Sequence, residues 1–322
     1  MKRAFLVTLV ALALLLASSG AALAAPGGTT WLVPGDFATI QQAIDSPAVA
    51  SGDTIVVGPG EWAGATVNKQ LTIEGEDGAI IVGGGPLHPA GFYMGFNLEA
   101  NSGGTIISHF TFAGADLAIR NAAAVNGVTV THCVFLHTLQ GVSNWGGSDW
   151  TITHNVFKDL WARNGGGIAI LIGDRSFTPG GVNGNVVSYN KISGLLDLVS
   201  GEGGGYNGAG VSIYADFRNP AWGALLITGN VISHNRVNMV SENPDLVDFD
   251  AVELSYATGQ LPPPDDKTAQ GVIYGNLILF NDLRGSANTI ALNPTALEAS
   301  NTISRNLGHV PNRGHDLTPA VF

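Results

Sequence analysis

The chain has 322 residues, of which 45% are hydrophobic, and a formal charge of −11 from 14 basic and 25 acidic side chains. This hydrophobic content excludes a disordered chain, and the negative charge argues against nucleic acid as a partner. The single cysteine, Cys133, cannot close a disulfide or build a zinc site within the chain. It is therefore either buried as a small hydrophobic residue or reactive.

The N-terminal residues 1–24 have the organisation of a secretory signal peptide. Two basic residues precede an apolar stretch over residues 4–17, and Ala22-Leu23-Ala24 matches a cleavage site. The alternative is an uncleaved anchor, although the apolar stretch is short for a membrane span. We expect cleavage before Ala25, one domain over residues 25–322, no membrane span in the mature chain, and a secreted protein in an extracellular or periplasmic location.

The first predicted elements of the mature chain are a short amphipathic helix over residues 39–44 and a strand over residues 53–57. The strand ends at a turn, Gly58-Pro59-Gly60. From residue 105 onward the sequence becomes repetitive. We identify copies of an eight-residue pattern at 105–112, 128–135, 150–157, 185–192, 225–232, 271–278 and 301–308.

Each copy has Val or Ile at its third position, and the last five have Asn at the sixth. A second short strand follows most copies, for example Gly210-Val211-Ser212-Ile213. A unit of about 22 residues without an amphipathic helix cannot bury its own apolar face, so successive units must stack. The sequence therefore predicts an all-β solenoid, a single-stranded right-handed parallel β-helix of about seven to nine coils, whose open end the N-terminal helix caps.

Two columns of side chains follow from this alignment. We expect Ile152, Val187, Ile227 and Ile273 to point inward in one column. The recurrent Asn predicts an asparagine ladder, because an amide can donate to one neighbour and accept from the other. The alternative is that Asn only tolerates a turn conformation at this position.

The segment Asp36-Phe37-Ala38-Thr39-Ile40-Gln41-Gln42-Ala43-Ile44, followed by Gly52-Asp53-Thr54-Ile55-Val56-Val57, resembles the opening of right-handed parallel β-helix proteins of the pectin-lyase-like superfamily. With the repeats, the resemblance covers about residues 30 to 310. It implies the fold. It does not choose a function, because the superfamily includes lyases, hydrolases, esterases, epimerases and non-catalytic surface proteins.

The resemblance offers few catalytic candidates. Gly-His-Gly and Arg-x-Lys, typical of polygalacturonase-like members, are absent. Arg218-Asn219-Pro220 begins the Arg-x-Pro-x-x-Arg pattern of pectate-lyase-like members, but Gly223 ends it, so Arg218 is either a lyase base or a surface turn residue. Asp216 and Glu253 are outward acids on neighbouring coils. Strand geometry places their backbones about 14 Å apart, too far for a hydrolytic pair without help from loops.

The segment 242–253 holds five acidic residues. Carboxylates on a loop suit Ca²⁺, and Asp245, Asp248 and Asp250 are the candidate ligands, although an acidic solvated insertion explains the same residues. His109, His132 and His154 occupy the fifth position of three consecutive copies. We expect their rings to stack about 4.8 Å apart, either as neutral side chains that fill a turn or as metal ligands.

The second strands present a different face. The alignment places Ser143, Ala169, Ser212 and Glu253 in one outward column. Trp145, Leu171, Tyr214 and Ser255 form the next. Aromatic rings beside short polar residues suit sugar binding, and loops beside a rigid solenoid are common binding sites. Trp145, Tyr214, Ser212 and Ser255 are therefore the candidate carbohydrate-binding residues, against the alternative of a glycine-rich surface with scattered aromatics.

The leading functional hypothesis is recognition of an extracellular polysaccharide or cell-surface glycan, with processing of that polymer as an extension. The first alternative is a non-catalytic structural or adhesive surface protein. The second is a calcium-dependent uronate polysaccharide lyase that uses Arg218 and the acids of 242–253.

Overall fold

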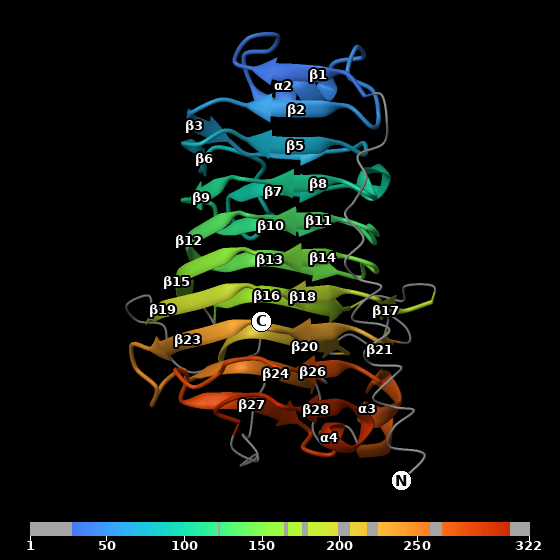
Figure 1. Ribbon diagram of the computed structural model, residues 1–322, viewed down its shortest axis with the longest axis vertical. Coiled ribbons are helices and arrows are strands. Elements are labelled where there is room, and N and C mark those ends of the chain that lie inside the picture. Colours follow the sequence, from blue (N-terminus) through green and yellow to red (C-terminus); the bar gives the residue numbers. More distant parts are fainter. Residues whose placement is uncertain are drawn as a thin grey trace.

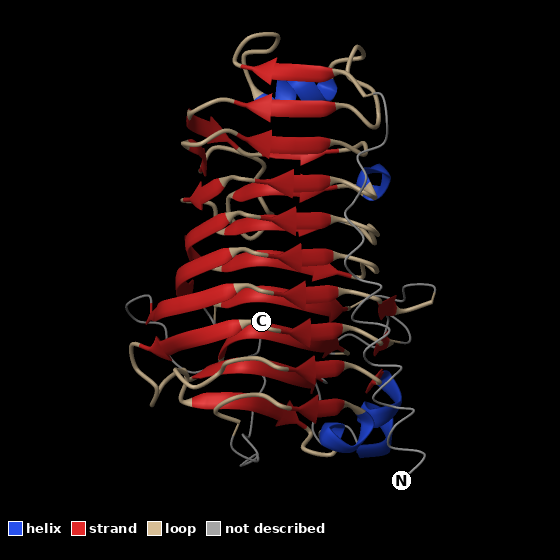
Figure 2. Cartoon of the chain, in the orientation of Figure 1, coloured by secondary structure: helices blue, strands red, loops and turns tan. Residues whose placement is uncertain are grey.

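The computed structural model describes residues 28–121, 123–163, 167–175, 180–198, 207–217, 225–257 and 266–309. These residues wind coil after coil into a tall stack of parallel strands (Figure 1), with helices at the two ends of the stack (Figure 2). The predicted parallel β-helix is confirmed. The predicted signal peptide lies outside the described residues. None of the described helices is both long and apolar enough to cross a bilayer.

Three large sheets and one small sheet run along the stack. The ten-stranded sheet contains β1 (Thr30–Val33), β2 (Thr54–Val57), β5 (Thr72–Gly75), β8 (Ile106–Ser108), β11 (Thr129–Thr131), β14 (Thr151–Thr153), β18 (Val186–Ser188), β22 (Val231–Ser233), β26 (Leu277–Leu279) and β28 (Thr302–Ser304). The eight-stranded sheet contains β4 (Ala65–Val67), β7 (Met94–Leu98), β10 (Leu117–Asn121), β13 (Gln140–Trp145), β16 (Ile168–Asp174), β20 (Gly208–Asp216), β24 (Phe249–Ala257) and β27 (Asn288–Asn293).

The seven-stranded sheet contains β3 (Gly60–Ala63), β6 (Ala79–Val82), β9 (Thr111–Ala113), β12 (Val134–Thr138), β15 (Val156–Ala162), β19 (Lys191–Leu198) and β23 (Arg236–Ser241). The three-stranded sheet contains β17 (Val182–Asn183), β21 (Ile227–Thr228) and β25 (Ile273–Tyr274). The helices are α2 (Ile40–Asp45), the 3-10 turn η1 (Ala100–Ser102), α3 (Asp266–Val272) and α4 (Leu297–Ser300). Ten strands in the tallest sheet exceed the predicted seven to nine coils, because the first coils lack the repeat pattern.

The predicted helix exists as α2 and lies at the N-terminal end of the stack (Figure 1). The side chain of Thr39 accepts a hydrogen bond from the Gln42 N–H, which caps the helix, and Ile40, Ala43 and Ile44 are buried against the first coils. This apolar contact covers the end of the core, as a terminal cap of a solenoid must.

The predicted inward column is wrong in register after Val187. Val187 pairs with Ile232 in the ten-stranded sheet, whereas Ile227 pairs with Val182 on one side and with Ile273 on the other in the three-stranded sheet. All of these side chains are buried. The sequence alignment failed because each later coil carries two similar Asn-containing turns, and the pattern at 225–232 and 271–278 belongs to a different turn from that at 185–192.

The buried asparagines form two hydrogen-bonded columns, one at each turn. In the first column, the Nδ2 of Asn190 donates to the Oδ1 of Asn235 at 3.0 Å and to the Ile152 carbonyl at 2.9 Å. The same pattern continues through Asn155, Asn190, Asn235, Asn281 and Asn306. The second column runs through Asn144, Asn185, Asn230, Asn276 and Asn301. These amides satisfy the backbone groups that the turns leave inside the coil.

Candidate functional site

The outer face of the eight-stranded sheet carries most of the predicted site residues. Val211 pairs with Val252, so Ser212 lies beside Glu253, and Asp216 lies beside Ala257, as predicted. The register of β16 differs from the prediction by two residues, because Leu171 rather than Ala169 pairs with Ser212. Ala169 instead packs in the core. Two outward columns are observed. The first contains Ser143, Leu171, Ser212, Glu253 and Ala291, and the second contains Trp145, Gly173, Tyr214, Ser255 and Asn293.

Glu253 is the chemically distinctive residue of this face. Its side chain is buried, and the Ser212 hydroxyl donates a hydrogen bond of 2.7 Å to its Oε2. Burial raises the pKa of Glu253 to about 7, and the nearby negative charge of Asp250 contributes to this rise. A carboxyl group in this environment holds its proton close to neutral pH.

Asp250 is the second acid at this position. In the sheet, Asp250 lies next to Ala209, and Ala209 lies next to Ile168. The side chain of Ile168 packs against Leu171 and Tyr214 on the outside of the sheet and not in the core. This row of the sheet therefore faces outward. The Nδ2 of Asn207 donates to Asp250 Oδ2 at 3.2 Å. The structure thus couples Glu253 electrostatically to Asp250. The sequence analysis had considered Asp216 as the second acid and found it too far from Glu253 for a hydrolytic pair without help from loops.

The other predicted acids do not join this pair. Asp216 is buried four positions along β20 from Ser212, the residue that contacts Glu253. Arg218 lies outside the described residues. Asp245 is exposed, and Asp248 accepts hydrogen bonds from the Phe249 N–H and from Asn288 Nδ2, the latter at 2.6 Å. Within the described residues, no three His, Cys, Asp or Glu side chains are grouped so that they could hold a metal ion. The proposed calcium ligands therefore do not converge there.

Trp145 and Tyr214 contact each other across an intervening strand. Their ring centroids are 6.1 Å apart in an edge-to-face arrangement. Gly173 lies between them in the sheet, and a Cβ there would come within 2.8 Å of the Trp145 ring. The absent side chain makes room for the ring. The guanidinium of Arg175 lies 3.6 Å from the centre of the Trp145 ring and covers one of its faces.

This face is less open than the sequence analysis expected. All nine residues of β20 and all nine of β24 are buried, and Tyr214 is 8% exposed. Trp145 is half-buried and so remains the more accessible of the two rings. Ser212 and Ser255 are buried, and the position of Ser212 suits contact with Glu253 rather than with a ligand.

The predicted histidine column belongs to a different surface, the turn between the ten- and seven-stranded sheets. The rings of His109, His132 and His154 stack with centroids 5.2 and 5.3 Å apart, which confirms the predicted stacking. The stack continues beyond the predicted residues to Tyr189, His234 and Phe280, and the guanidinium of Arg305 lies over the last ring. Every member has a left-handed backbone with φ between 54° and 63°.

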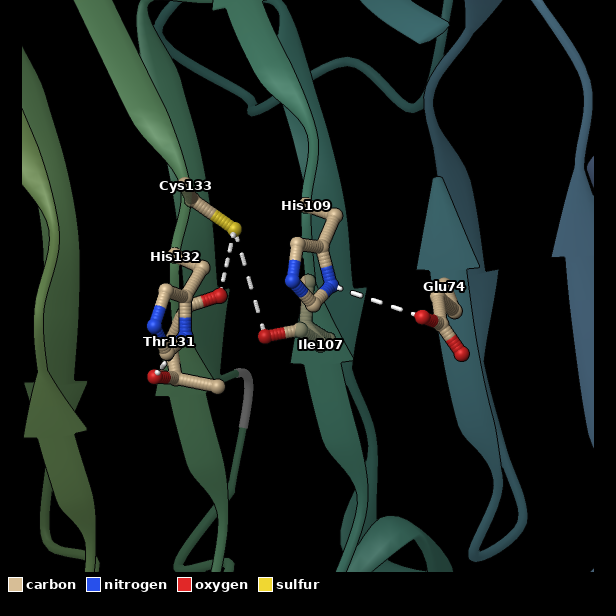
Figure 3. Close-up of polar contacts among 6 residues, drawn as sticks. All are labelled: Glu74, Ile107, His109, Thr131, His132 and Cys133. Carbon is tan, nitrogen blue, oxygen red and sulfur yellow. Dashed lines mark hydrogen bonds and ion pairs between the residues drawn. The ribbon is translucent and has the colours of Figure 1, made fainter. Parts of the chain in front are cut away.

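Figure 3 shows the N-terminal end of this column, where His109 Nδ1 lies 3.5 Å from Glu74 Oε1. Burial lowers the pKa of His132, and the charges of His109 and His154 lower it further, so the middle ring resists protonation. Cys133 follows His132 in the chain and is buried, with its Sγ 3.5 Å from the Thr131 carbonyl oxygen (Figure 3). Burial raises the pKa of Cys133 to about 12, so the thiol is inert at neutral pH.

Sequence reasoning missed two features of the site. It assigned Asp250 to metal binding rather than to the environment of Glu253, and it did not anticipate that Arg175 covers Trp145. The spacing of Asp250 and Glu253 was a poor signal, because residues three apart fall on opposite faces of a regular strand and share a face only where the strand bends. The contact of Arg175 with Trp145 depends on the register of β13 and β16, which the sequence alignment misplaced by two residues.

Comparisons with known proteins give only distant structural matches. No family model matches the chain, and no curated protein matches it. Among solved structures, the catalytic domain of a GH87 alpha-1,3-glucanase in complex with nigerose is 16% identical, with a TM-score of 0.38; the match covers 89% of this chain and 67% of that one. A mutant of pectin methylesterase in complex with a hexasaccharide is 13% identical, with a TM-score of 0.27, over 80% of this chain and 79% of that one. Such low scores carry no argument about ligand or reaction.

Proposed function

We propose that the protein is an exported enzyme that binds a polysaccharide and hydrolyses its glycosidic bonds on the outer face of the eight-stranded sheet. The observation that carries this proposal is the pairing of Glu253, whose pKa is raised to about 7, with the neighbouring carboxyl group of Asp250. Glycoside hydrolysis needs two carboxyl groups in different protonation states, one to donate a proton and one to remain charged.

The two acids have distinct roles in this proposal. Protonated Glu253 donates its proton to the oxygen of the leaving sugar, as a general acid does. Asp250 remains ionised and either activates a water molecule or stabilises positive charge that develops on the sugar ring. Ser212 holds the Glu253 carboxyl in place through its hydrogen bond. The same surroundings that raise the pKa of Glu253 thus prepare it for proton transfer near neutral pH.

The ligand contact of this proposal centres on Trp145. Its half-buried ring can pack on the apolar face of a sugar, and Tyr214 supports the ring from two strands further along the same column. Parallel strands stacked about 4.8 Å apart form an extended surface that suits an extended polymer. Ser255 follows Tyr214 in the same column and is buried, so it packs beneath the contact surface and does not touch the sugar.

Export is the second part of the proposal and has its own test. We expect the secreted protein to begin at Ala25 because Ala22-Leu23-Ala24 follows the apolar stretch. N-terminal sequencing of protein recovered from the culture medium or periplasm checks this. An intact N-terminus that begins at Met1 in such a sample would contradict it.

The enzymatic proposal is tested by release of reducing ends from a panel of neutral and acidic polysaccharides. The panel compares the wild type with Glu253→Gln and with Glu298→Gln, a matched change of an exposed glutamate. We expect Glu253→Gln to lose at least about 100-fold in rate, because a general acid contributes that much, and Glu298→Gln to keep full activity. No release from any polymer by the wild type, or equal rates in wild type and Glu253→Gln, would overturn the proposal.

A second candidate function, a non-catalytic scaffold, is favoured by the burial of β20 and β24 on both faces. In that case Glu253 serves only packing, and Glu253→Gln changes stability without affecting any activity. A third outcome of the same assay is a product with an unsaturated sugar, detected by its absorption in the near ultraviolet. Such a product would indicate a lyase and not a hydrolase.

A further inference from the structure

Arg120 lies on the outer face of the eight-stranded sheet, toward the N-terminal end of the stack from Glu253. It pairs with Asn97 on β7 and with Ser143 on β13, in the same outward column as Glu253. Its guanidinium is half-buried, and burial lowers the pKa of Arg120. Its Nη1 lies 3.5 Å from the Sδ of Met94, a weak acceptor. Within the described residues Arg120 has no carboxylate partner.

Arg120 lacks a counter-charge among the described residues although it is half-buried. The sequence has 25 acidic and 14 basic side chains, so partners for an arginine are abundant. A half-buried charge usually has a counter-charge, because its desolvation is otherwise uncompensated. The second charge near this position is also positive: Arg120 and Arg175 both lie close enough to His88 to lower its pKa, after burial as the main cause, so His88 itself stays neutral. The face around Arg120 is therefore a local positive region on a negatively charged protein.

Asn97 provides an independent observation at the same place. Its side chain is 8% exposed, and its Oδ1 is buried without a hydrogen-bond donor in the described part of the chain. A buried acceptor of this kind costs roughly 1–3 kcal/mol unless something donates to it. Asn97 is the direct neighbour of Arg120 in the sheet. A group that carries both a negative charge and a hydroxyl donor would satisfy the two side chains together after a rotation of the amide.

We infer that Arg120 and Asn97 form a binding subsite for an acidic sugar, with the guanidinium on the sugar's carboxylate or sulfate and the amide oxygen on a neighbouring hydroxyl. Four strand spacings separate Arg120 from Glu253 in their common column, or about 19 Å. One polymer lying along the stack can therefore reach both. The inference deepens the proposed function and rests on it, since it assigns the polymer to the acidic class.

The experiment uses single sugars, so it does not depend on hydrolysis. Binding of D-glucuronate, D-glucose 6-sulfate, D-glucose and inorganic sulfate is followed by NMR chemical shifts of the arginine side chains and by calorimetry. The variants are Arg120→Gln and Arg236→Gln. Arg236 is exposed and lines a pocket of about 310 Å³ on the seven-stranded sheet, so its loss removes the same charge elsewhere.

We expect the wild type and Arg236→Gln to bind glucuronate or glucose 6-sulfate better than glucose and better than sulfate alone. Arg120→Gln should bind the preferred acidic sugar at least tenfold more weakly. Asn97→Asp provides a second test if Arg120→Gln folds poorly, because the new carboxylate should pair with Arg120 and abolish anion binding in a stably folded protein. The comparison of glucuronate with glucose 6-sulfate decides between the carboxylate and the sulfate.

Three results would overturn the inference: no binding of either acidic sugar to the wild type, equal binding by Arg120→Gln and the wild type, or equal binding of inorganic sulfate and the acidic sugars. A failure of the hydrolase proposal gives a different result. Glu253→Gln would then match the wild type in every activity assay while Arg120→Gln alone still lost sugar binding.

Discussion

The turn column from His109 to Arg305 and the outer face of the eight-stranded sheet are built on the same coils but differ in kind. In the turn column, seven successive coils repeat one left-handed backbone conformation, and most side chains are rings that stack. On the sheet, one column changes from serine to leucine to serine to glutamate to alanine. A side chain that recurs in every coil serves the stacking of the coils. A position whose residue changes from coil to coil, such as that of Glu253, is free to serve another role.

The largest effect should come from breaking a repeated column inside the coils. Asn190→Ala removes the acceptor of Asn155 and the donor to Asn235 and to the Ile152 carbonyl. These buried groups lose their partners, so we expect the free energy of unfolding to fall by roughly 3–5 kcal/mol. Urea denaturation measures it. Asn238→Ala, at an exposed position, is the control and should cost less than about 0.5 kcal/mol; similar losses at both sites would mean that the column contributes little.

The next effect distinguishes Glu253 on the sheet face from the buried asparagine columns by the pH dependence of stability. Folded Glu253 keeps its proton up to a pKa of about 7, whereas the unfolded chain loses it near 4.5. The folded state therefore binds more protons between these values, and the stability of the wild type falls as the pH rises through this window. Glu253→Gln lacks this loss.

We expect Glu253→Gln to match the wild type in stability at pH 4 and to exceed it by roughly 3 kcal/mol at pH 8. Urea denaturation at the two pH values checks this expectation. Asn190→Ala should destabilise the protein by the same amount at both pH values, because it changes no titratable group. A Glu253→Gln variant with no gain at pH 8 would mean that the glutamate has an ordinary pKa.

A smaller effect concerns recognition. Trp145→Ala should weaken binding of the polysaccharide substrate by at least tenfold, about 1.4 kcal/mol, because its ring is the accessible aromatic surface on the same sheet face as Glu253, three strands away. Tyr214→Phe should bind nearly as well as the wild type, since Tyr214 is buried beside Trp145 and supports it by ring contact. Affinity electrophoresis in a gel that contains the polymer compares the variants. Unchanged migration of folded Trp145→Ala would move the binding surface away from this ring.

The smallest effect should come from the exposed turn column. Tyr189 stacks between His154 and His234 but is 54% exposed. Tyr189→Asn keeps a residue that tolerates the left-handed backbone and removes only the ring contacts. We expect thermal denaturation to show a loss of less than about 1 kcal/mol and no change in glycan binding. A large loss of binding would assign function to the column instead of the sheet.

The comparison also explains what the sequence could predict. The parallel β-helix, the capping helix and the histidine stack follow from local patterns that recur along the chain. The register of later coils failed because the two asparagine columns have nearly the same local sequence, as Asn185 and Asn230 show. The environment of Glu253 could not be predicted, because its pKa depends on burial and on Asp250, which shares its face only after the strand bends.

The central claim is that burial and the charge of Asp250 keep the Glu253 carboxyl group protonated close to neutral pH. The direct measurement is the pH titration of the Glu253 side-chain carboxyl carbon by NMR, assigned by its absence in Glu253→Gln. The account predicts a midpoint near pH 7, which moves downward in Asp250→Asn because the neighbouring negative charge is removed. A midpoint near 4.5, unchanged in Asp250→Asn, would contradict it.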